Sequence, residues 1–202
     1  ILLIASYGLL LHGGGAARLR AGLHYVVLNL AGSGLFLVAV GILYGVTGTL
    51  NMADLAVRVA GAPPADAALI RAGALLLLVV FGLKAALLPL YFWLPEAYSA
   101  ATAPVAALFA IMTKVGVYAI LRIFTLAFGP GAGVVADVAS DWLLPLGLAT
   151  LALGTLGALA SHGLRTLVSY LLIASIGTLL TAVGLFSAQG ISAAIYYLFH
   201  ST

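Results

Sequence analysis

The chain has 202 residues, of which 64% are hydrophobic and only 6% are charged, with a formal net charge of +3. Soluble domains carry about 25% charged residues, so this composition excludes an ordinary water-soluble fold and indicates a protein whose solvent is the lipid bilayer. The chain has no cysteine, which excludes disulfides and thiolate sites. Its Lys and Arg residues form no basic cluster, so nucleic-acid binding is not expected.

Long apolar runs predict an all-α membrane protein, a polytopic helical bundle, because a helix needs about 20 apolar residues to cross the hydrocarbon core. Strands are not expected, since the runs show no period-two alternation. Both ends of the sequence lie inside apolar runs, so we expect a fragment of one transmembrane domain, 1–202. In chain order the predicted spans are about 1–11, 23–45, 70–94, 104–128, 142–160, 167–187 and 191–202.

The loops between these spans differ in charge, and this difference predicts the orientation of the chain. The loops 12–22 and 161–166 carry arginine, whereas 129–141 carries aspartate and neither Lys nor Arg. The positive-inside rule therefore places the first two loops in the cytoplasm and the third outside. The loop 46–67 also falls outside, where its Arg58 is accompanied by aspartates.

Ionisable residues inside the spans are the strongest functional signal. Lys84 and Lys114 lie near the centres of the third and fourth predicted spans, and His200 lies at a comparable depth in the last. A charge at the bilayer centre costs about 2.5–3.5 kcal/mol on insertion scales. An apolar environment destabilises the ammonium form, so a buried lysine can gain and lose a proton, and histidine does so readily. The three residues are predicted to form a proton relay; the alternative is that the lysines bridge helices structurally or reach the interface.

Other polar or irregular positions are candidates for supporting roles. Pro89 follows Lys84 and predicts a broken helix, of a kind that often lines ion pathways, although a simple kink is the alternative. Glu96 is predicted to lie in a plain interfacial turn; the alternatives are that it orients a helix end or pairs with a cation near the cytoplasmic side. Ser175 either binds a neighbouring helix or lines a water path. No metal-ligand spacing, nucleophile motif or nucleotide-binding loop is found, so we expect no catalytic residue, metal or cofactor.

Several ordered motifs resemble those of a known family. They are Phe81-Gly82-Leu83-Lys84-Ala85-Ala86, Pro89-Leu90, Trp93-Leu94-Pro95-Glu96-Ala97, Ala103-Pro104-Val105 and Lys114-Val115-Gly116-Val117-Tyr118. They are similar to motifs of the antiporter-like membrane subunits that respiratory complex I, membrane-bound hydrogenases and Mrp-type cation/proton antiporters share. Within that family, residues 2–6, 25–30 and 47–55 are most similar to the D-type subunit of Mrp antiporters.

The resemblance implies an inverted-repeat, antiporter-like fold and a role for each of the three ionisable residues. Lys84 matches a lysine on a broken helix, Lys114 a bridging lysine on the next helix, and His200 a histidine on a later helix. The carboxylate partner of Lys84, a glutamate, is expected to precede Ile1. That carboxylate would hold Lys84 protonated, and its withdrawal would release the proton towards Lys114. Ser175 stands where some relatives have histidine or glutamine.

Three functions are compatible with these features. The first is a subunit that exchanges Na⁺ or K⁺ for H⁺, together with other membrane subunits of a hetero-oligomeric complex in the bacterial inner membrane; this subunit would be a transporter and not an enzyme. The second is a proton-pumping subunit of NADH:quinone oxidoreductase or of a membrane-bound hydrogenase, and thus part of a translocase. The third is a scaffold that transports nothing.

Overall fold

The computed structural model describes residues 2–12 and 14–201, and over this range it is built of helices joined by turns. The predicted all-α fold class is therefore confirmed. In chain order the elements are α1 (Leu2–Leu11), α2 (Ala16–Thr47), α3 (Met52–Ala60), the 3₁₀ helix η1 (Pro64–Asp66), α4 (Ala67–Ala85), α5 (Trp93–Ala100), α6 (Ala103–Leu126), the 3₁₀ helix η2 (Gly133–Val135), α7 (Ser140–Leu159), α8 (Leu164–Gly184) and α9 (Ala188–His200).

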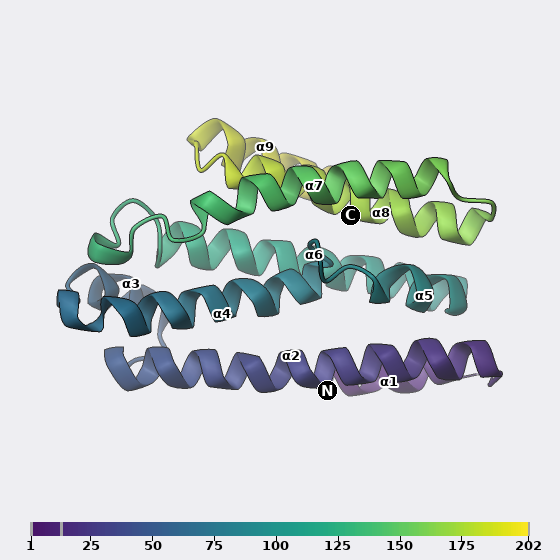
Figure 1. The fold of residues 1–202 in the computed structure, drawn as a ribbon, viewed down its shortest axis with the longest axis horizontal. Helices are drawn as coiled ribbons and strands as arrows, with labels where there is room; N and C mark the ends of the chain where they lie inside the picture. Colours follow the sequence, from purple (N-terminus) through teal and green to yellow (C-terminus); the bar gives the residue numbers. More distant parts are fainter. Residues whose placement is uncertain (1, 13, 202) are drawn as a thin grey trace.

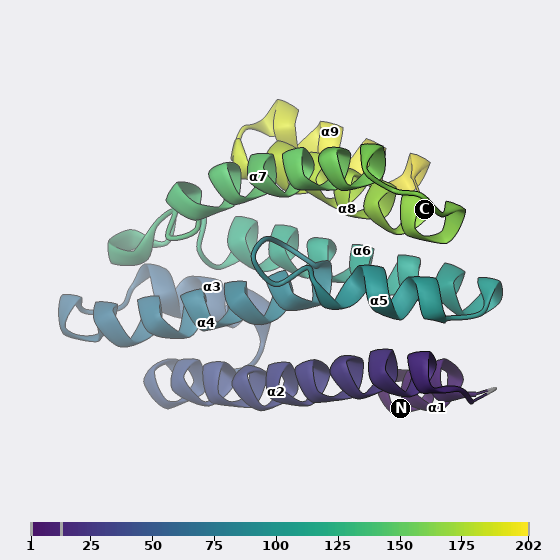
Figure 2. The ribbon, with the colours of Figure 1, turned by 45° about the vertical axis from the view of Figure 1, so that its right-hand side comes forward.

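The long helices lie side by side in three layers (Figures 1 and 2). Helix α2, with α1 against it, forms one outer layer, while α4, α5 and α6 form the middle layer and α7, α8 and α9 the other outer layer. Helix α2 packs on α4, α4 packs on α6, and α7 and α8 form the most extensive pair. Successive long helices alternate in direction, so the connections α1–α2, α5–α6 and α7–α8 gather at one end of the bundle.

Five helical segments of the described chain are long and apolar enough to cross a bilayer. They are Ala16–Thr47, Pro64–Ala85, Ala103–Leu126, Gly133–Leu159 and Leu164–Gly184. These segments overlap the second to sixth predicted spans, whereas α1 and α9 are shorter. Residues 1 and 202 of the outermost predicted spans lie outside the described residues. The membrane crossing of each individual helix stays a prediction.

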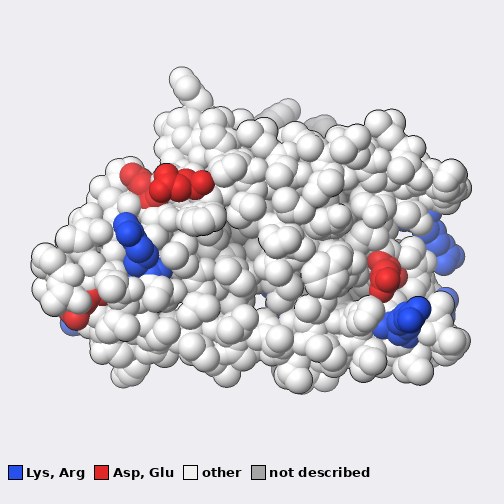
Figure 3. Space-filling model, in the orientation of Figure 1, with Lys and Arg blue, Asp and Glu red and all other residues white. Residues whose placement is uncertain are grey.

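Charged side chains gather at the two ends of the bundle, and the face in Figure 3 shows an uncharged band between them. Arg18 and Arg20, near the start of α2, and Arg165, near the start of α8, belong to the end predicted to be cytoplasmic. Asp137 and Asp141 lie in or beside the α6–α7 connection at the opposite end. An uncharged band between two charged rims is what a bilayer requires.

The helix that carries Lys84 ends earlier than the sequence predicted. The expected interruption was at Pro89, but α4 ends at Ala85. A proline ring clashes with the carbonyl four residues before it, and that carbonyl belongs to Ala85, so the helix stops there. Ala86 takes a left-handed conformation with φ of 58°, and the Leu87 amide donates to the Gly82 carbonyl at 2.8 Å. This pattern is a common helix termination.

Neighbouring elements hold the break in place by hydrogen bonds. The indole Nε1 of Trp93, at the start of α5, donates to the Leu83 carbonyl at 3.1 Å. The Leu88 amide donates to Thr150 Oγ1 on α7 at 3.0 Å, and that hydroxyl donates in turn to the Leu146 carbonyl at 2.6 Å. In a bilayer each backbone group must find a partner inside the protein, so these contacts stabilise the interruption and tie it to α7.

Glycines allow α7 and α8 to pack backbone against backbone. A Cβ atom at Gly177 of α8 would lie 2.3 Å from the Leu151 amide nitrogen of α7. A Cβ at Gly154 of α7 would lie 2.5 Å from the Ala174 nitrogen of α8. Small residues at such crossings let membrane helices approach closely, so this pair depends on the absence of side chains.

We expect Gly177→Ala to destabilise the full-length protein by roughly 1–3 kcal/mol, the usual range for overpacking a tight contact. The reason is that the new methyl group meets backbone atoms that cannot move without separating the two helices. Thermal unfolding of the purified protein in detergent measures the effect.

Gly41→Ala is the matched control, because a Cβ at Gly41 of α2 would meet nothing within 4 Å. If Gly177→Ala unfolds at the same temperature as Gly41→Ala, the α7–α8 contact is looser than described.

Candidate functional site

Lys84 lies half-buried at the end of α4, beside the break. Its Nζ donates a hydrogen bond to Oδ1 of Asn29 on α2. Asn29 is 4% exposed, and its Nδ2 donates to the Tyr25 carbonyl of its own helix at 2.7 Å. That bond orients the amide so that its oxygen faces the lysine.

Neither lysine pairs with a carboxylate in the part of the chain that the structure describes. The ion pairs found there join Arg58 to Asp54 at 3.4 Å and His24 to Glu96 at 3.0 Å. The ammonium group of Lys84 is met by an amide oxygen, and that of Lys114 by a hydroxyl. A buried cation without an anion is costly, so this arrangement marks both residues as functional candidates.

A small cavity of about 30 Å³ adjoins Lys84. A single water molecule needs about 10–15 Å³ of such space and several polar partners, so the cavity fits water and nothing much larger. Residues of α2, α4, α5 and α6 line it, and they include both polar and aromatic side chains. The lining residues are Tyr25, Asn29, Lys84, Trp93, Tyr98, Phe109, Met112 and Thr113.

Lys114 lies in the middle of α6 and is 5% exposed. Its Nζ donates to the Ser201 hydroxyl, just after α9, at 3.1 Å. Two residues further along α6, a Cβ at Gly116 would lie 2.8 Å from the amide nitrogen of Ala85. Residues two apart on a helix point to nearly opposite sides. Lys114 therefore faces α9, while Gly116 packs against the break.

Helix α6 separates the surroundings of the two lysines. Thr113 lines the cavity beside Lys84, and the next residue, Lys114, binds Ser201 on the α9 side. Consecutive helical side chains are about 100° apart, so one turn of α6 faces both environments. Each lysine thus has its own neutral partner. Lys84 binds Asn29, and Lys114 binds Ser201 on the α9 side of α6.

His200 is the last residue of α9 and is exposed. Its ring stacks on Tyr196, with centroids 6.4 Å apart. It directly precedes Ser201, which accepts the hydrogen bond from Lys114. Ser175 of α8 accepts a hydrogen bond from the Tyr197 hydroxyl of α9 at 3.2 Å, and so joins these two helices.

Glu96 lies in the first turn of α5, and its Oε2 is 3.0 Å from Nδ1 of His24 on α2. Both side chains are more than half exposed, at 54% and 56%. The Arg18 guanidinium also reaches α5 and donates to the Ala100 carbonyl at 3.0 Å. Exposed ion pairs contribute little stability, so these contacts orient α5 at the end predicted to be cytoplasmic.

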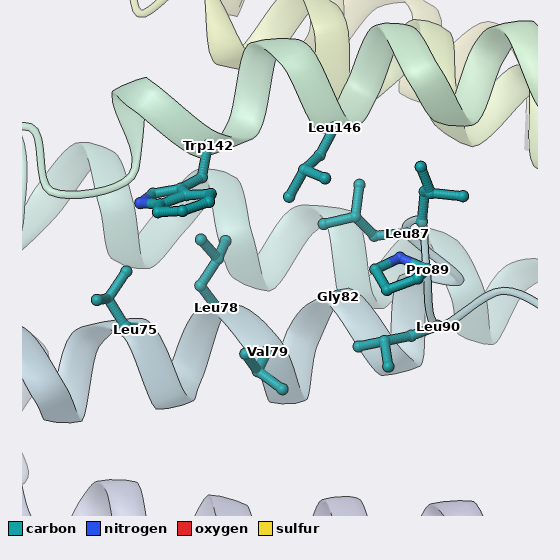
Figure 4. Close-up of a pocket in the computed structure, with 10 residues that line it drawn as sticks. Leu75, Leu78, Val79, Gly82, Leu87, Pro89, Leu90, Trp142 and Leu146 are labelled. Carbon is teal, nitrogen blue, oxygen red and sulfur yellow. The ribbon is translucent and has the colours of Figure 1, made fainter.

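Pro89 borders a different and apolar hollow, which lies between α4, the break and α7 (Figure 4). This hollow has a volume of about 280 Å³, and Trp142 and Leu146 extend towards it from α7. Apolar cavities stay dry, so Pro89 shapes the break without belonging to the polar cavity at Lys84.

Sequence reasoning did not single out Asn29, His24 or Tyr98. Asn29 is one of several polar residues in the predicted spans, and its pairing with Lys84 joins residues far apart in the chain. Among the described residues, no cluster of His, Cys, Asp and Glu could hold a metal ion. The groups that are present, two amines, hydroxyls, an imidazole and a water-sized cavity, are suited to proton transfer.

The sequence matches a family model described as NADH:quinone oxidoreductase/Mrp antiporter, TM, over residues 1–201. It is 49% identical to the D-type subunit of a probable K(+)/H(+) antiporter of Rhizobium meliloti (strain 1021), over 100% of this chain and 38% of that protein. It is 45% identical to the D-type subunit of the Na(+)/H(+) antiporter of Bacillus subtilis (strain 168), over 99% of this chain and 40% of that protein. The chain thus spans about two-fifths of the length of these relatives.

Solved structures show the same fold. A chain of the Mrp complex from Dietzia sp. DQ12-45-1b matches with a TM-score of 0.85 and 32% identity, over 99% of this chain and 36% of that chain. A chain of the membrane-bound sulfane sulfur reductase, an archaeal respiratory membrane complex, matches with a TM-score of 0.87 and 29% identity, over 98% and 40%. A chain of respiratory complex I from Thermus thermophilus matches with a TM-score of 0.73 and 29% identity, over 98% and 41%.

These matches confirm the antiporter-like helical fold with a broken helix near Pro89 that the motifs implied. They also agree with the similarity to D-type subunits, because identity to those relatives extends over essentially the whole chain. The chain therefore belongs to the NADH:quinone oxidoreductase/Mrp antiporter family of multi-pass membrane proteins.

Proposed function

We propose that this chain is part of a membrane subunit of a monovalent cation/proton antiporter in a bacterial inner membrane. Within it, Lys84, Lys114 and His200 relay protons near the middle of the membrane. The observation that carries the proposal is the placement of both lysines in apolar helices against neutral oxygens. Relatives named as K(+)/H(+) and Na(+)/H(+) antiporter subunits support the exchange of either K⁺ or Na⁺ for H⁺.

The geometry suits stepwise proton transfer. Asn29 Oδ1 accepts a hydrogen bond from the Lys84 ammonium but carries no charge, so it orients the lysine without trapping its proton. Water in the adjoining cavity accepts the proton from Lys84 and carries it to the α6 side. Lys114 is the next station, and the Ser201 hydroxyl can accept its hydrogen bond and donate another towards His200. A carboxylate outside the chain described here would complete the Lys84 site.

A redox-driven proton pump is the second candidate. Its support is at the level of fold, where TM-scores of 0.87 and 0.73 to chains of respiratory complexes stand beside 0.85 to a chain of the Mrp complex, so the fold is compatible with both functions. Sequence identity favours the antiporter, since the identity is 49% and 45% to the D-type subunits but 29% to the respiratory chains. Antiport would be performed with the other membrane subunits of a hetero-oligomeric complex.

We expect Lys84→Gln to abolish proton exchange, because glutamine keeps a polar side chain of similar length but cannot carry a proton. The measurement is Na⁺-driven and K⁺-driven proton exchange in everted vesicles that contain the full-length protein in its complex. Native gel electrophoresis verifies that the complex assembles.

Arg71→Gln is the matched control, because it removes an exposed cation near the start of the same helix. Normal exchange with Lys84→Gln would overturn the relay. A wild-type complex without cation-dependent exchange would favour the redox-driven pump.

Asn29→Ala is expected to lower the exchange rate about tenfold while the complex still assembles, since it leaves the buried Lys84 ammonium without its acceptor. Ser33→Ala is the control, because Ser33 lies one turn further along α2 and its hydroxyl donates to the backbone carbonyl of Asn29 at 2.8 Å, whereas Lys84 binds the side-chain oxygen. Equal rates for the two variants would show that Asn29 does not take part.

A further inference from the structure

The hydroxyl of Tyr98, on α5, is buried and has no hydrogen-bond partner among the residues that the structure describes. The residue as a whole is 4% exposed. Buried tyrosine hydroxyls usually find a partner, because leaving one unpaired costs free energy. A polar ligand small enough to reach this position is therefore expected.

Tyr98 lines two hollows of the bundle. One is the small cavity that Lys84 also lines. The other is a groove of about 460 Å³ between α6 and α8. The groove includes Ser169 and the exposed Arg165, which lies at the end predicted to be cytoplasmic. Short alanine side chains leave the groove open; they are Ala101, Ala103, Ala106, Ala107 and Ala110.

The surroundings of Tyr98 leave water as the partner that fits best. The Thr113 hydroxyl approaches from α6, but the two make no hydrogen bond of ordinary length and angle. Thr113 donates its own hydrogen to the Ala110 carbonyl at 2.8 Å. The cavity of about 30 Å³ has room for a water molecule.

Packing also fixes the position of the Tyr98 ring. Its centroid is 6.3 Å from that of Trp93 and 5.8 Å from that of Phe109. A ring held by neighbours loses little further freedom when its hydroxyl binds a ligand. The ring is thus held in place where Tyr98 borders both the groove and the cavity beside the lysine.

We propose that the Tyr98 hydroxyl binds water between the groove and the cavity, and passes protons between the cytoplasmic end of the bundle and Lys84. Its oxygen receives the excess proton of a protonated water on the groove side while its own proton passes to the cavity water, which delivers a proton to the Lys84 amine. The phenol is neutral before and after each transfer. This inference rests on the proposed antiport function.

The test is Tyr98→Phe in the full-length protein within its complex, assayed as cation-driven proton exchange in everted vesicles. We expect a loss of about tenfold in rate, because the ring remains and only one hydrogen-bonding group is removed. Tyr98→His should recover much of the rate, since imidazole can accept and donate a proton. If Tyr98 served packing alone, Phe would be harmless and His harmful, which would overturn the inference.

Tyr44→Phe is the matched control, because Tyr44 is 53% exposed near the far end of α2. It should leave the rate unchanged. Full activity of Tyr98→Phe combined with an inactive Lys84→Gln would overturn the role of Tyr98 and leave the proposed function standing. Absence of exchange in the wild-type complex would overturn the proposed function itself.

A second measurement tests whether water enters the groove. This stretch of chain contributes no cysteine, so Ala106→Cys can be introduced into a background without other cysteines. Everted vesicles present the cytoplasmic face to a charged, membrane-impermeant thiol reagent. We expect the groove cysteine to react and the reaction to block exchange.

Leu156→Cys is the control position, because Leu156 is 61% exposed on α7 towards the same end, where lipid would keep a thiol unreactive. If Ala106→Cys is as unreactive as Leu156→Cys, the groove is not hydrated and the path through Tyr98 is wrong.

Discussion

The break between α4 and α5 is the feature on which the rest of the structure depends. An apolar bundle can interrupt a helix only where the freed backbone groups find other partners. Here the partners are the Leu87 amide for Gly82, the Trp93 indole for Leu83, and Thr150 for the Leu88 amide. Because these partners come from the turn itself, from α5 and from α7, the break ties the middle layer of the bundle to the outer layer that contains α7. It also places Lys84 at the end of a helix, next to a cavity.

Helix α6 determines which side chains face the break and which face α9. Gly116 lets α6 approach the backbone at Ala85 closely, which brings Thr113 to the cavity and turns Lys114 towards α9. The two lysines are thus separated by one helix rather than by open space. In the proposed relay, a proton that leaves one lysine passes the polar groups of α6 or water beside them. A substitution that moves α6 away from the break would therefore disturb both sites together.

The sequence predicts the class of fold, and it singles out Lys84 and Lys114 as ionisable residues within apolar runs, because composition, run length and position in a run are local chain properties. Pro89 predicted an interruption of the helix. The helix ends four residues earlier, at Ala85, because the proline ring would clash with the Ala85 carbonyl in a continuous helix. The residues that contact Lys84 and Lys114 were not predictable in the same way. Asn29 differs in no local respect from other polar residues in apolar runs, and its contact with Lys84 arises only when α2 and α4 pack. Nor did Tyr98 stand out in sequence, since its significance lies in bordering two hollows.

The ionisable side chains of the described chain differ in the partners that they contact. At the ends of the bundle, Arg58 and His24 meet the carboxylates of Asp54 and Glu96, whereas Arg18 donates to backbone carbonyls. Inside, Lys84 and Lys114 meet only neutral oxygens in the described chain. A carboxylate fixed beside a buried lysine would favour the charged state permanently, whereas a neutral acceptor can orient either the ammonium or the amine. In the relay that we propose, control of the proton therefore comes from a charge that approaches the lysine and withdraws. A neutral partner such as Asn29 leaves the lysine open to that charge, because no permanent ion pair competes with it.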